Sequence, residues 1–274
     1  MKHAGVVTVL AALLMVAGCG SSDGADSLFE VSTSVVSHET TQDVSVWAPD
    51  TEGPWPIVFA VHGTGADRSR WDVTGPALAS QGMVVFAPDY RSTEPQYLER
   101  DVVCAWRYAA SVADEYGGDL DQTITFVGHS FGATAVFIAG LDEAAYGPGG
   151  TYDQCLTAAP MPNLIVPIAG CHYEFGEIKT DFASKVSTMS NRDVDVVLIA
   201  GSDDEACQAW QSQNATTDLK AEGYDATYLQ IDAADHFTVI YKDLVDGEVV
   251  TVPDDPAGDE VVLTILDAID AAGS

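Results

Sequence analysis

The chain has 274 residues, of which 47% are hydrophobic, enough for one core of the size that a single α/β domain needs. Its 42 acidic and 11 basic residues give a formal net charge of −31. This acidity argues against nucleic-acid binding, which needs a basic patch to displace counterions from phosphates, and we expect it to keep the body of the protein off anionic lipid.

The N-terminal residues have the pattern of an export signal. Lys2 precedes an apolar run at 4–17, which is too short to span a bilayer but has the length of a signal-peptide core. The run ends in Val16-Ala17-Gly18-Cys19, which resembles the lipobox of bacterial lipoproteins. In that family the cysteine is lipidated and becomes the first residue of the mature protein. The alternative is an ordinary secretory signal with an incidental cysteine.

The lipobox interpretation divides the chain into three parts. Residues 1–18 are the signal peptide, and residues 19–27 hold the lipidated Cys19 and a short flexible tether. Residues 28–274 then form one domain, without a repeat or a second domain. We therefore expect an extracytoplasmic protein that reaches the bacterial cell membrane through its lipid anchor only.

Strand and helix patterns alternate along the rest of the chain. Strands are expected at 43–48, 56–61, 83–87, 123–128, 164–169, 194–200 and 226–231. Helices are expected at 71–81, 97–116, 133–141, 205–221 and 261–271, and loops at 146–154 and 253–259. The runs at 56–61 and 83–87 are continuously apolar, as in strands buried on both faces, whereas 43–48 alternates polar and apolar residues and suits an outer strand. This alternation predicts an α/β fold, a mostly parallel sheet with helices on both faces.

The most informative stretch is 123–141. A β-rich run leads into Gly128-His129-Ser130-Phe131-Gly132, and a helix-compatible run of small residues follows it. This is the nucleophile-elbow pattern, in which a serine sits on a tight strand-to-helix turn with its hydroxyl exposed. The two glycines suit the close approach of strand and helix. The pattern predicts that Ser130 is a nucleophile.

A serine nucleophile needs a base, and the base needs an orienting carboxylate. Behind an elbow of this kind the acid precedes the histidine in the chain. The strand at 194–200 is followed by Gly201-Ser202-Asp203-Asp204, and only His236 of the six histidines comes after it. We expect His236 as the base. Families that this pattern resembles usually carry the acid three residues after the glycine that ends the strand, which implies Asp204 as the acid, with Asp203 as the alternative. The other aspartate would then cap the helix that starts near Glu205.

His62-Gly63-Thr64-Gly65 follows the strand at 56–61. It resembles the HGGG-type oxyanion motif of esterases, with a threonine in place of one glycine. The oxyanion would be held by the backbone N–H of Phe131 and by that of Thr64 or a neighbour. The alternative is a plain strand-ending turn.

These motifs together resemble the α/β-hydrolase superfamily over nearly the whole mature chain. Within it, residues 88–91, Asp101 with 105–106, and 115–119 resemble carboxylesterases of the acetyl-esterase and dienelactone-hydrolase kind. The resemblance implies a serine esterase without a cofactor or metal, acting on a small-molecule or polymer-borne ester. The alternatives are a peptidase or a polyester or lipid hydrolase on the same fold, or a non-catalytic surface-binding module.

Four cysteines remain once Cys19 is assigned to lipid, and they allow three pairings. Cys171 and Cys207 each follow the end of a strand, and these strands are consecutive in the chain, so we expect them to form a disulfide. Cys104 would then pair with Cys155 by elimination or stay reduced. No Cys-x-x-Cys or His-Glu-x-x-His spacing indicates a redox or zinc site.

The connection between the strands at 164–169 and 194–200 is short, and in this architecture lids usually enter there. It contains no long amphipathic run that could fold over the site. We therefore expect an open cleft and a preference for short acyl esters, C2 to C4. The expected substrate-contacting residues are Gly63, Gly65, His129, Phe131, Tyr173 and Phe237.

Overall fold

The computed structural model describes residues 27–37, 43–94, 97–142, 155, 158–175 and 178–273. The predicted signal peptide, Cys19 and nearly all of the tether lie outside the described residues, as does the predicted loop at 146–154. Within these ranges, no helix is both long enough and apolar enough to cross a bilayer.

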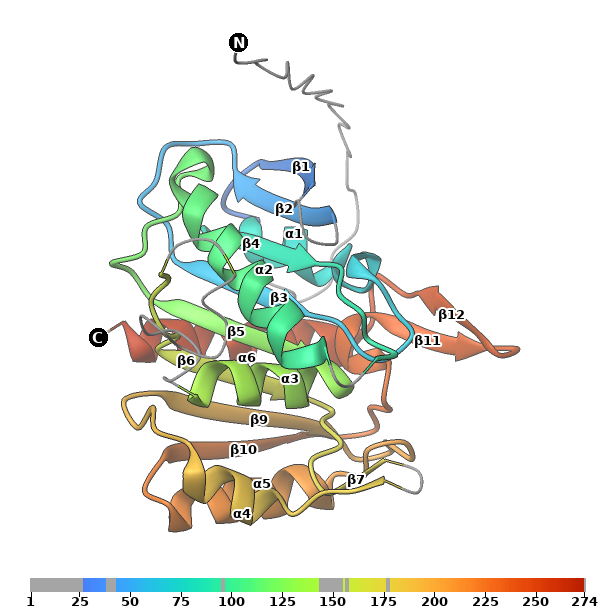
Figure 1. Cartoon of the computed structure of the whole chain (residues 1–274). Coiled ribbons are helices and arrows are strands. Elements are labelled where there is room, and N and C mark those ends of the chain that lie inside the picture. The colour runs from blue at the N-terminus through green and yellow to red at the C-terminus, as the bar shows by residue number, and fades with distance from the viewer. Residues whose placement is uncertain are drawn as a thin grey trace.

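An eight-stranded sheet runs through the middle of the molecule in the order β1-β2-β4-β3-β5-β6-β9-β10 (Figure 1). The pairs β1–β2 and β2–β4 are antiparallel, and all other neighbours in the sheet are parallel. The sequence-based prediction of a mostly parallel sheet is therefore confirmed. The strands are β1 Val31–Ser37, β2 Asp43–Pro49, β3 Ile57–Val61, β4 Val84–Pro88, β5 Ile124–His129, β6 Leu164–Ile168, β9 Asp195–Gly201 and β10 Asp225–Ile231.

Helices cover both faces of the sheet (Figure 1). One face carries α2 (Leu98–Val112), α3 (Phe131–Leu141), α4 (Phe182–Thr188) and α5 (Trp210–Ala221). The other face carries α1 (Thr74–Ala79) and α6 (Pro256–Ala272). Each face has its own apolar core.

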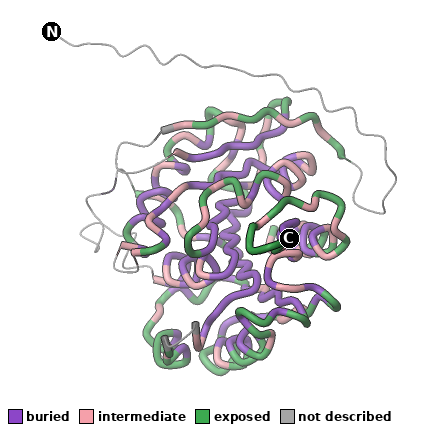
Figure 2. The backbone as a smooth tube through the Cα atoms, turned by 90° about the vertical axis from the view of Figure 1, so that its right-hand side faces the viewer, coloured by how far each residue is buried: buried purple, intermediate pink, exposed green. Residues whose placement is uncertain are grey.

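The apolar runs of the central strands supply both cores. In β3, Ile57 and Phe59 pack toward α2 and α3, whereas Val58 and Ala60 pack toward α1 and α6. This division follows from the alternation of side chains along a strand. Every residue of β3, β4, β5 and β6 is buried, so the middle of the backbone lies deep in the molecule (Figure 2).

Several predicted boundaries were wrong. The helix predicted at 205–221 begins only at Trp210. The last helix begins at Pro256, inside the predicted loop, because the Asp255 side chain accepts a hydrogen bond from the N–H of Ala257 and caps the helix. The helix predicted at 97–116 ends at Val112 and continues as the 3₁₀-helix η3, Ala113–Tyr116.

Other elements were not predicted at all. They are β1, α4, the 3₁₀-helices η1 (Arg68–Trp71) and η5 (Thr238–Ile240), and two small hairpins. One hairpin pairs β7 (Glu174–Phe175) with β8 (Ile178–Lys179), and the other pairs β11 (Lys242–Val245) with β12 (Glu248–Thr251) and projects from the body (Figure 1). All are short or exposed, so their sequences lack a strong apolar period.

Candidate active site

Ser130 stands on the turn between β5 and α3 with φ 58° and ψ −120°, a backbone conformation that residues with a side chain rarely adopt. Its N–H donates to the carbonyl oxygen of Ile168 at 2.9 Å. A Cβ at Gly128 would lie 2.3 Å from the oxygen of Gly132, and one at Gly132 would lie 2.2 Å from the oxygen of Val61. The two glycines are therefore required by the close approach of β3, β5 and α3, as the elbow pattern predicts.

The structure brings Ser130, His236 and Asp204 together from three separate loops. The Oγ of Ser130 lies 2.9 Å from His236 Nε2, and the Oδ2 of Asp204 lies 2.8 Å from His236 Nδ1. All three residues are buried. Because β5 and β9 are parallel, their carboxyl ends share one edge of the sheet, and the loop after β10 meets them there.

Asp204, and not Asp203, contacts His236. Its Oδ1 also accepts hydrogen bonds from the N–H groups of Ala206 (2.8 Å) and Cys207 (2.7 Å). Asp203 is exposed, and its Oδ1 accepts from the hydroxyl of Ser202. The expected helix cap at Asp203 was wrong. The helix begins only at Trp210, and the N–H groups of the turn at 206 and 207 are bonded by Asp204 instead.

His129 contacts the loop that carries His236, and its expected contact with substrate stays a prediction. It is buried, and its Nε2 lies 2.7 Å from the backbone oxygen of His236. Burial lowers the pKa of His129 well below its ordinary value, so the ring is neutral and donates its Nε2–H to that carbonyl. The side chain thus holds the loop that carries His236.

The His236 loop is also fixed by its own turn and by the Asp204 loop. Asp235 Oδ1 accepts from the N–H groups of Phe237 (2.7 Å) and Thr238 (2.9 Å). A Cβ at Gly201 would lie 2.2 Å from the oxygen of Ala234, so the two loops are in close contact. The imidazole therefore has little freedom to move away from its partners.

The turn after β3 lies against the nucleophile. A Cβ at Gly63 would lie 3.0 Å from Ser130 Cβ. The turn is held by the Tyr90 hydroxyl, which donates to the oxygen of His62 at 2.5 Å, and by the N–H of Gly65, which donates to Ser92 Oγ at 3.0 Å. Residues 88–91 therefore support this turn.

Among the described residues, the backbone N–H groups of Phe131 and Thr64 have no acceptor. Phe131 is the first residue of α3, a position whose N–H has no partner within the helix. The N–H of exposed Thr64 likewise has no acceptor among the described residues. The N–H of Gly65, by contrast, is already used by Ser92.

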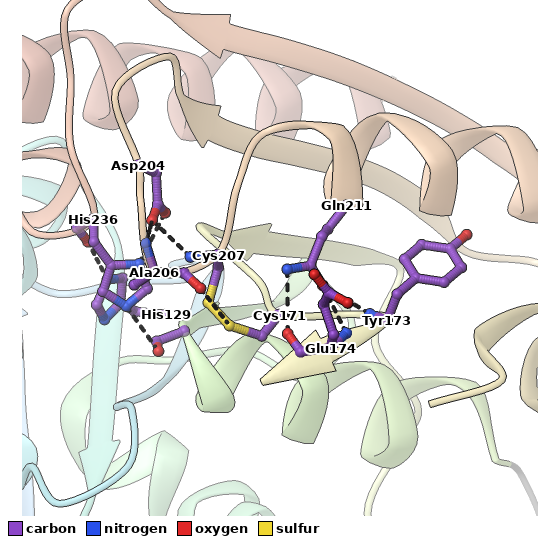
Figure 3. The surroundings of a disulfide bond; sticks show 10 residues. His129, Cys171, Tyr173, Glu174, Asp204, Ala206, Cys207, Gln211 and His236 are labelled. Carbon is purple, nitrogen blue, oxygen red and sulfur yellow. Dashed lines mark hydrogen bonds and ion pairs between the residues drawn. A yellow bond between two sulfur atoms is a disulfide. The ribbon is translucent and has the colours of Figure 1, made fainter. Parts of the chain in front are cut away.

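Tyr173 lies elsewhere than expected, and Arg70 lies near the site although the sequence did not predict it. Tyr173 does not lie beside His236: its hydroxyl donates to Asp218 at 2.5 Å, and Figure 3 shows it beyond the disulfide. Arg70 has its guanidinium carbon 5.8 Å from the ring centre of Phe237, which packs on His236. Burial lowers the pKa of Arg70. Its sequence context, between acidic residues, carried no signal for this position.

Both expected disulfides are present. Cys171 is linked to Cys207, and Cys104 is linked to Cys155. The Cys171–Cys207 bond lies next to the loop that carries Asp204 (Figure 3). The sequence-based pairing is confirmed.

A hollow of about 620 Å³ lies elsewhere, lined by Gly53, Pro54, Ser111, Asp114 and Leu120 among others. These residues precede β3 and β5 or belong to α2 and η3, so the hollow lies at the edge of the sheet opposite Ser130. Among the described residues, no group of three or more His, Cys, Asp or Glu side chains could hold a metal ion.

No model of a known protein family matches the chain, and no curated protein matches it in sequence. Solved structures match it in fold. Esterase B from Lactobacillus rhamnosis has a TM-score of 0.70 and 18% identity, covering 89% of this chain and 86% of that one. An esterase from the planctomycete Thermogutta terrifontis, solved with butyrate, has a TM-score of 0.63 and 16% identity, covering 88% and 94%.

A third structure, from Klebsiella pneumoniae and provisionally named a dienelactone hydrolase, has a TM-score of 0.62 and 15% identity, covering 88% of this chain and 99% of that one. The strand order, the elbow at Ser130 and these structural similarities all indicate the same fold. The described residues have the α/β-hydrolase fold.

Proposed function

We propose that this protein is a serine esterase that hydrolyses carboxylic esters through an acyl-enzyme. The observation that carries the proposal is the hydrogen-bonded chain from Ser130 Oγ through His236 to the Asp204 carboxylate. Nucleophile, base and orienting acid at these distances are the arrangement that acyl transfer by a serine requires.

In the proposed mechanism each of the three residues has one role. His236 Nε2 takes the Ser130 proton as the oxygen attacks the ester carbonyl, and then passes it to the leaving alcohol. Asp204 accepts from Nδ1–H, which leaves Nε2 unprotonated and able to act as the base. Water, activated by His236 in turn, releases the acid and restores the hydroxyl.

The oxyanion that forms during attack needs donors that are already in place. We assign this role to the N–H of Phe131, the residue after the nucleophile, and to that of Thr64, because neither has an acceptor among the described residues. Each such donor is worth roughly 2.7–4 kcal/mol of transition-state stabilisation in other serine hydrolases. Gly63 keeps the space beside Ser130 open for the substrate carbonyl, because a side chain there would contact the serine.

We further propose a preference for short acyl chains. The described part of the connection between β6 and β9 holds the small β7–β8 hairpin and α4, whose Phe182 packs inward against Phe137. This packing against α3 supports a short segment that does not cover Ser130. An acyl chain gains about 0.8 kcal/mol for each CH₂ only where it is buried. Among the structural neighbours, the Thermogutta esterase was solved with butyrate and with propionate.

Hydrolysis of p-nitrophenyl acetate, butyrate and palmitate tests both proposals. We expect the highest kcat/KM for acetate or butyrate, a fall toward palmitate, and no jump in rate when the substrate aggregates. If the protein hydrolysed none of the three esters, the esterase proposal would be contradicted. A preference for palmitate with activation at aggregation would instead indicate a lipase.

We propose an extracytoplasmic location, with the chain held to the cell membrane through lipid on Cys19. The lipobox pattern supports the anchor, and two disulfides in one domain are typical of an oxidising compartment.

Cys19→Ser should abolish membrane attachment and leave kcat on soluble esters unchanged, because residue 19 precedes 28–274, the expected catalytic domain, in the sequence. Detergent-phase partitioning of wild type and variant is the measurement. A variant that still partitions with the detergent phase would rule out lipidation at Cys19.

A further inference from the structure

The loop that carries the triad carboxylate, residues 202–209, contains neither helix nor strand. We call it the acid loop. Asp204 Oδ1 accepts from the N–H groups of Ala206 and Cys207, while Oδ2 faces His236. The plane of the carboxylate is therefore set by the backbone at 206–207, and anything that fixes this backbone also fixes the partner of His236.

A covalent bond fixes that backbone. Cys207 is fully buried and linked to Cys171, which follows β6. Figure 3 shows the disulfide directly beside the turn formed by Asp204, Ala206 and Cys207. Cys171 Sγ lies 3.6 Å from the carbonyl oxygen of Ala206. The bond thus contacts both residues whose N–H groups hold Oδ1.

The Cys171 end of the bond stands on the rigid core. A Cβ at Gly170 would lie 2.3 Å from the ring of His172, so the chain here is tightly packed. The His172 ring is buried between Phe137 of α3, at 5.1 Å between ring centres, and Phe182 of α4, at 5.4 Å. Moving this segment would disturb the core. The disulfide therefore holds the acid loop to a tightly packed segment, residues 170–174, which we call the platform.

Gln211 ties the far end of the acid loop to the same platform. Its Oε1 accepts from the N–H groups of Tyr173 (2.9 Å) and Glu174 (3.0 Å), and its Nε2 donates to the oxygen of Glu174 (3.2 Å) (Figure 3). Gln211 lies in the first turn of α5, which follows the acid loop. These contacts of Gln211 do not involve the Cys207 backbone, so the disulfide is the link closer to Asp204.

We propose that the Cys171–Cys207 disulfide is a positioning group for the Asp204 carboxylate, and that turnover at Ser130 depends on this bond being oxidised. The inference rests on the proposed esterase function. Without the bond, the N–H groups at 206 and 207 can move away from Oδ1, and His236 loses a fixed partner. A displacement of about 1 Å in a catalytic constellation can cost on the order of 10²-fold in rate.

The second disulfide is a matched control. Cys104–Cys155 closes a loop with a sequence separation of 51, and Cys171–Cys207 one of 36. Closure entropy grows only with the logarithm of loop length, so losing either bond should lower Tm by similar amounts. Cys104 lies on α2, away from the acid loop in the chain and in the sheet. Only one of the two bonds supports Asp204.

The test uses the full chain and two double variants, Cys171→Ser/Cys207→Ser and Cys104→Ser/Cys155→Ser. Each is made with Asp204 and with Asp204→Asn, and kcat and KM are measured on p-nitrophenyl acetate. With Asp204 present, Cys171→Ser/Cys207→Ser should lower kcat by about tenfold or more and change KM by less than about threefold. In the Asp204→Asn background the same change should cost less than about twofold, because residues acting as a unit are not additive.

The control variant should keep kcat within about twofold in both backgrounds. An equal loss of kcat in both backgrounds would show that the disulfide acts on general structure, and would overturn the proposal. Unchanged kcat in Cys171→Ser/Cys207→Ser would overturn it as well. In either case Ser130→Ala must be inactive in the same assay; if it is active, the esterase proposal fails together with this one.

If Cys171→Ser/Cys207→Ser does not fold, a second measurement still tests the proposal. Cys104→Ser/Cys155→Ser retains only the Cys171–Cys207 bond in the domain. Dithiothreitol passes two electrons and two protons to this bond, yielding two thiols and its own cyclic disulfide. Activity should fall with the appearance of these thiols and return on reoxidation. Full activity with both thiols free would overturn the proposal.

Discussion

Ser130→Ala is expected to reduce kcat for ester hydrolysis by on the order of 10⁶-fold, the loss seen when a triad serine is removed. The physical reason is that Oγ is the only heavy atom that the substitution removes, and in the proposed mechanism this oxygen forms the acyl-enzyme. The backbone bond from the Ser130 N–H to Ile168 is unaffected. We therefore expect a change of less than about 1 kcal/mol in the free energy of unfolding.

Kinetics on p-nitrophenyl acetate and labelling by a fluorophosphonate probe check this expectation. The probe should label the wild type at Ser130 and leave Ser130→Ala unlabelled. Ser111→Ala is a suitable control, because Ser111 is exposed and its hydroxyl donates to the Tyr108 oxygen of its own helix. Substantial turnover by Ser130→Ala, with contamination excluded, would rule out the serine mechanism and favour a binding module on a hydrolase scaffold.

Asp204→Asn should lower kcat by about 10⁴-fold, whereas Asp203→Asn should change it by no more than a few-fold. The N–H groups of Ala206 and Cys207 require an acceptor at Oδ1. An asparagine at 204 must therefore turn its oxygen to them and its NH₂ toward His236 Nδ1. That forces the proton of the imidazole onto Nε2, which can then no longer accept the Ser130 proton.

The Asp203 variant differs because its carboxylate is exposed and contacts Ser202 rather than His236. The measurement is kcat for both variants at one pH, with circular dichroism to verify that each is folded. If Asp203→Asn were the inactive variant, the two carboxylates would have to exchange roles.

The sequence alone determined those features that local patterns encode. Continuous apolar runs predicted the central strands, because strands buried on both faces have no polar side. Gly128 and Gly132 around Ser130 predicted the elbow, because only glycine fits where strand and helix backbones nearly touch. The order of acid and histidine then singled out His236.

Tertiary structure alone decided what depends on contacts between distant segments. Asp203 and Asp204 are adjacent carboxylates that the sequence left as expected acid and alternative, and the position of the His236 loop shows which of them contacts the imidazole. His129 became a support for that loop, and Tyr173 turned toward α5, because packing set the direction of each side chain. The Cys171–Cys207 disulfide was predicted as a pairing. Its contact with the turn that holds the Asp204 carboxylate was not, because this contact arises only when β6 and β9 pair in the sheet and bring the ends of both strands to one edge.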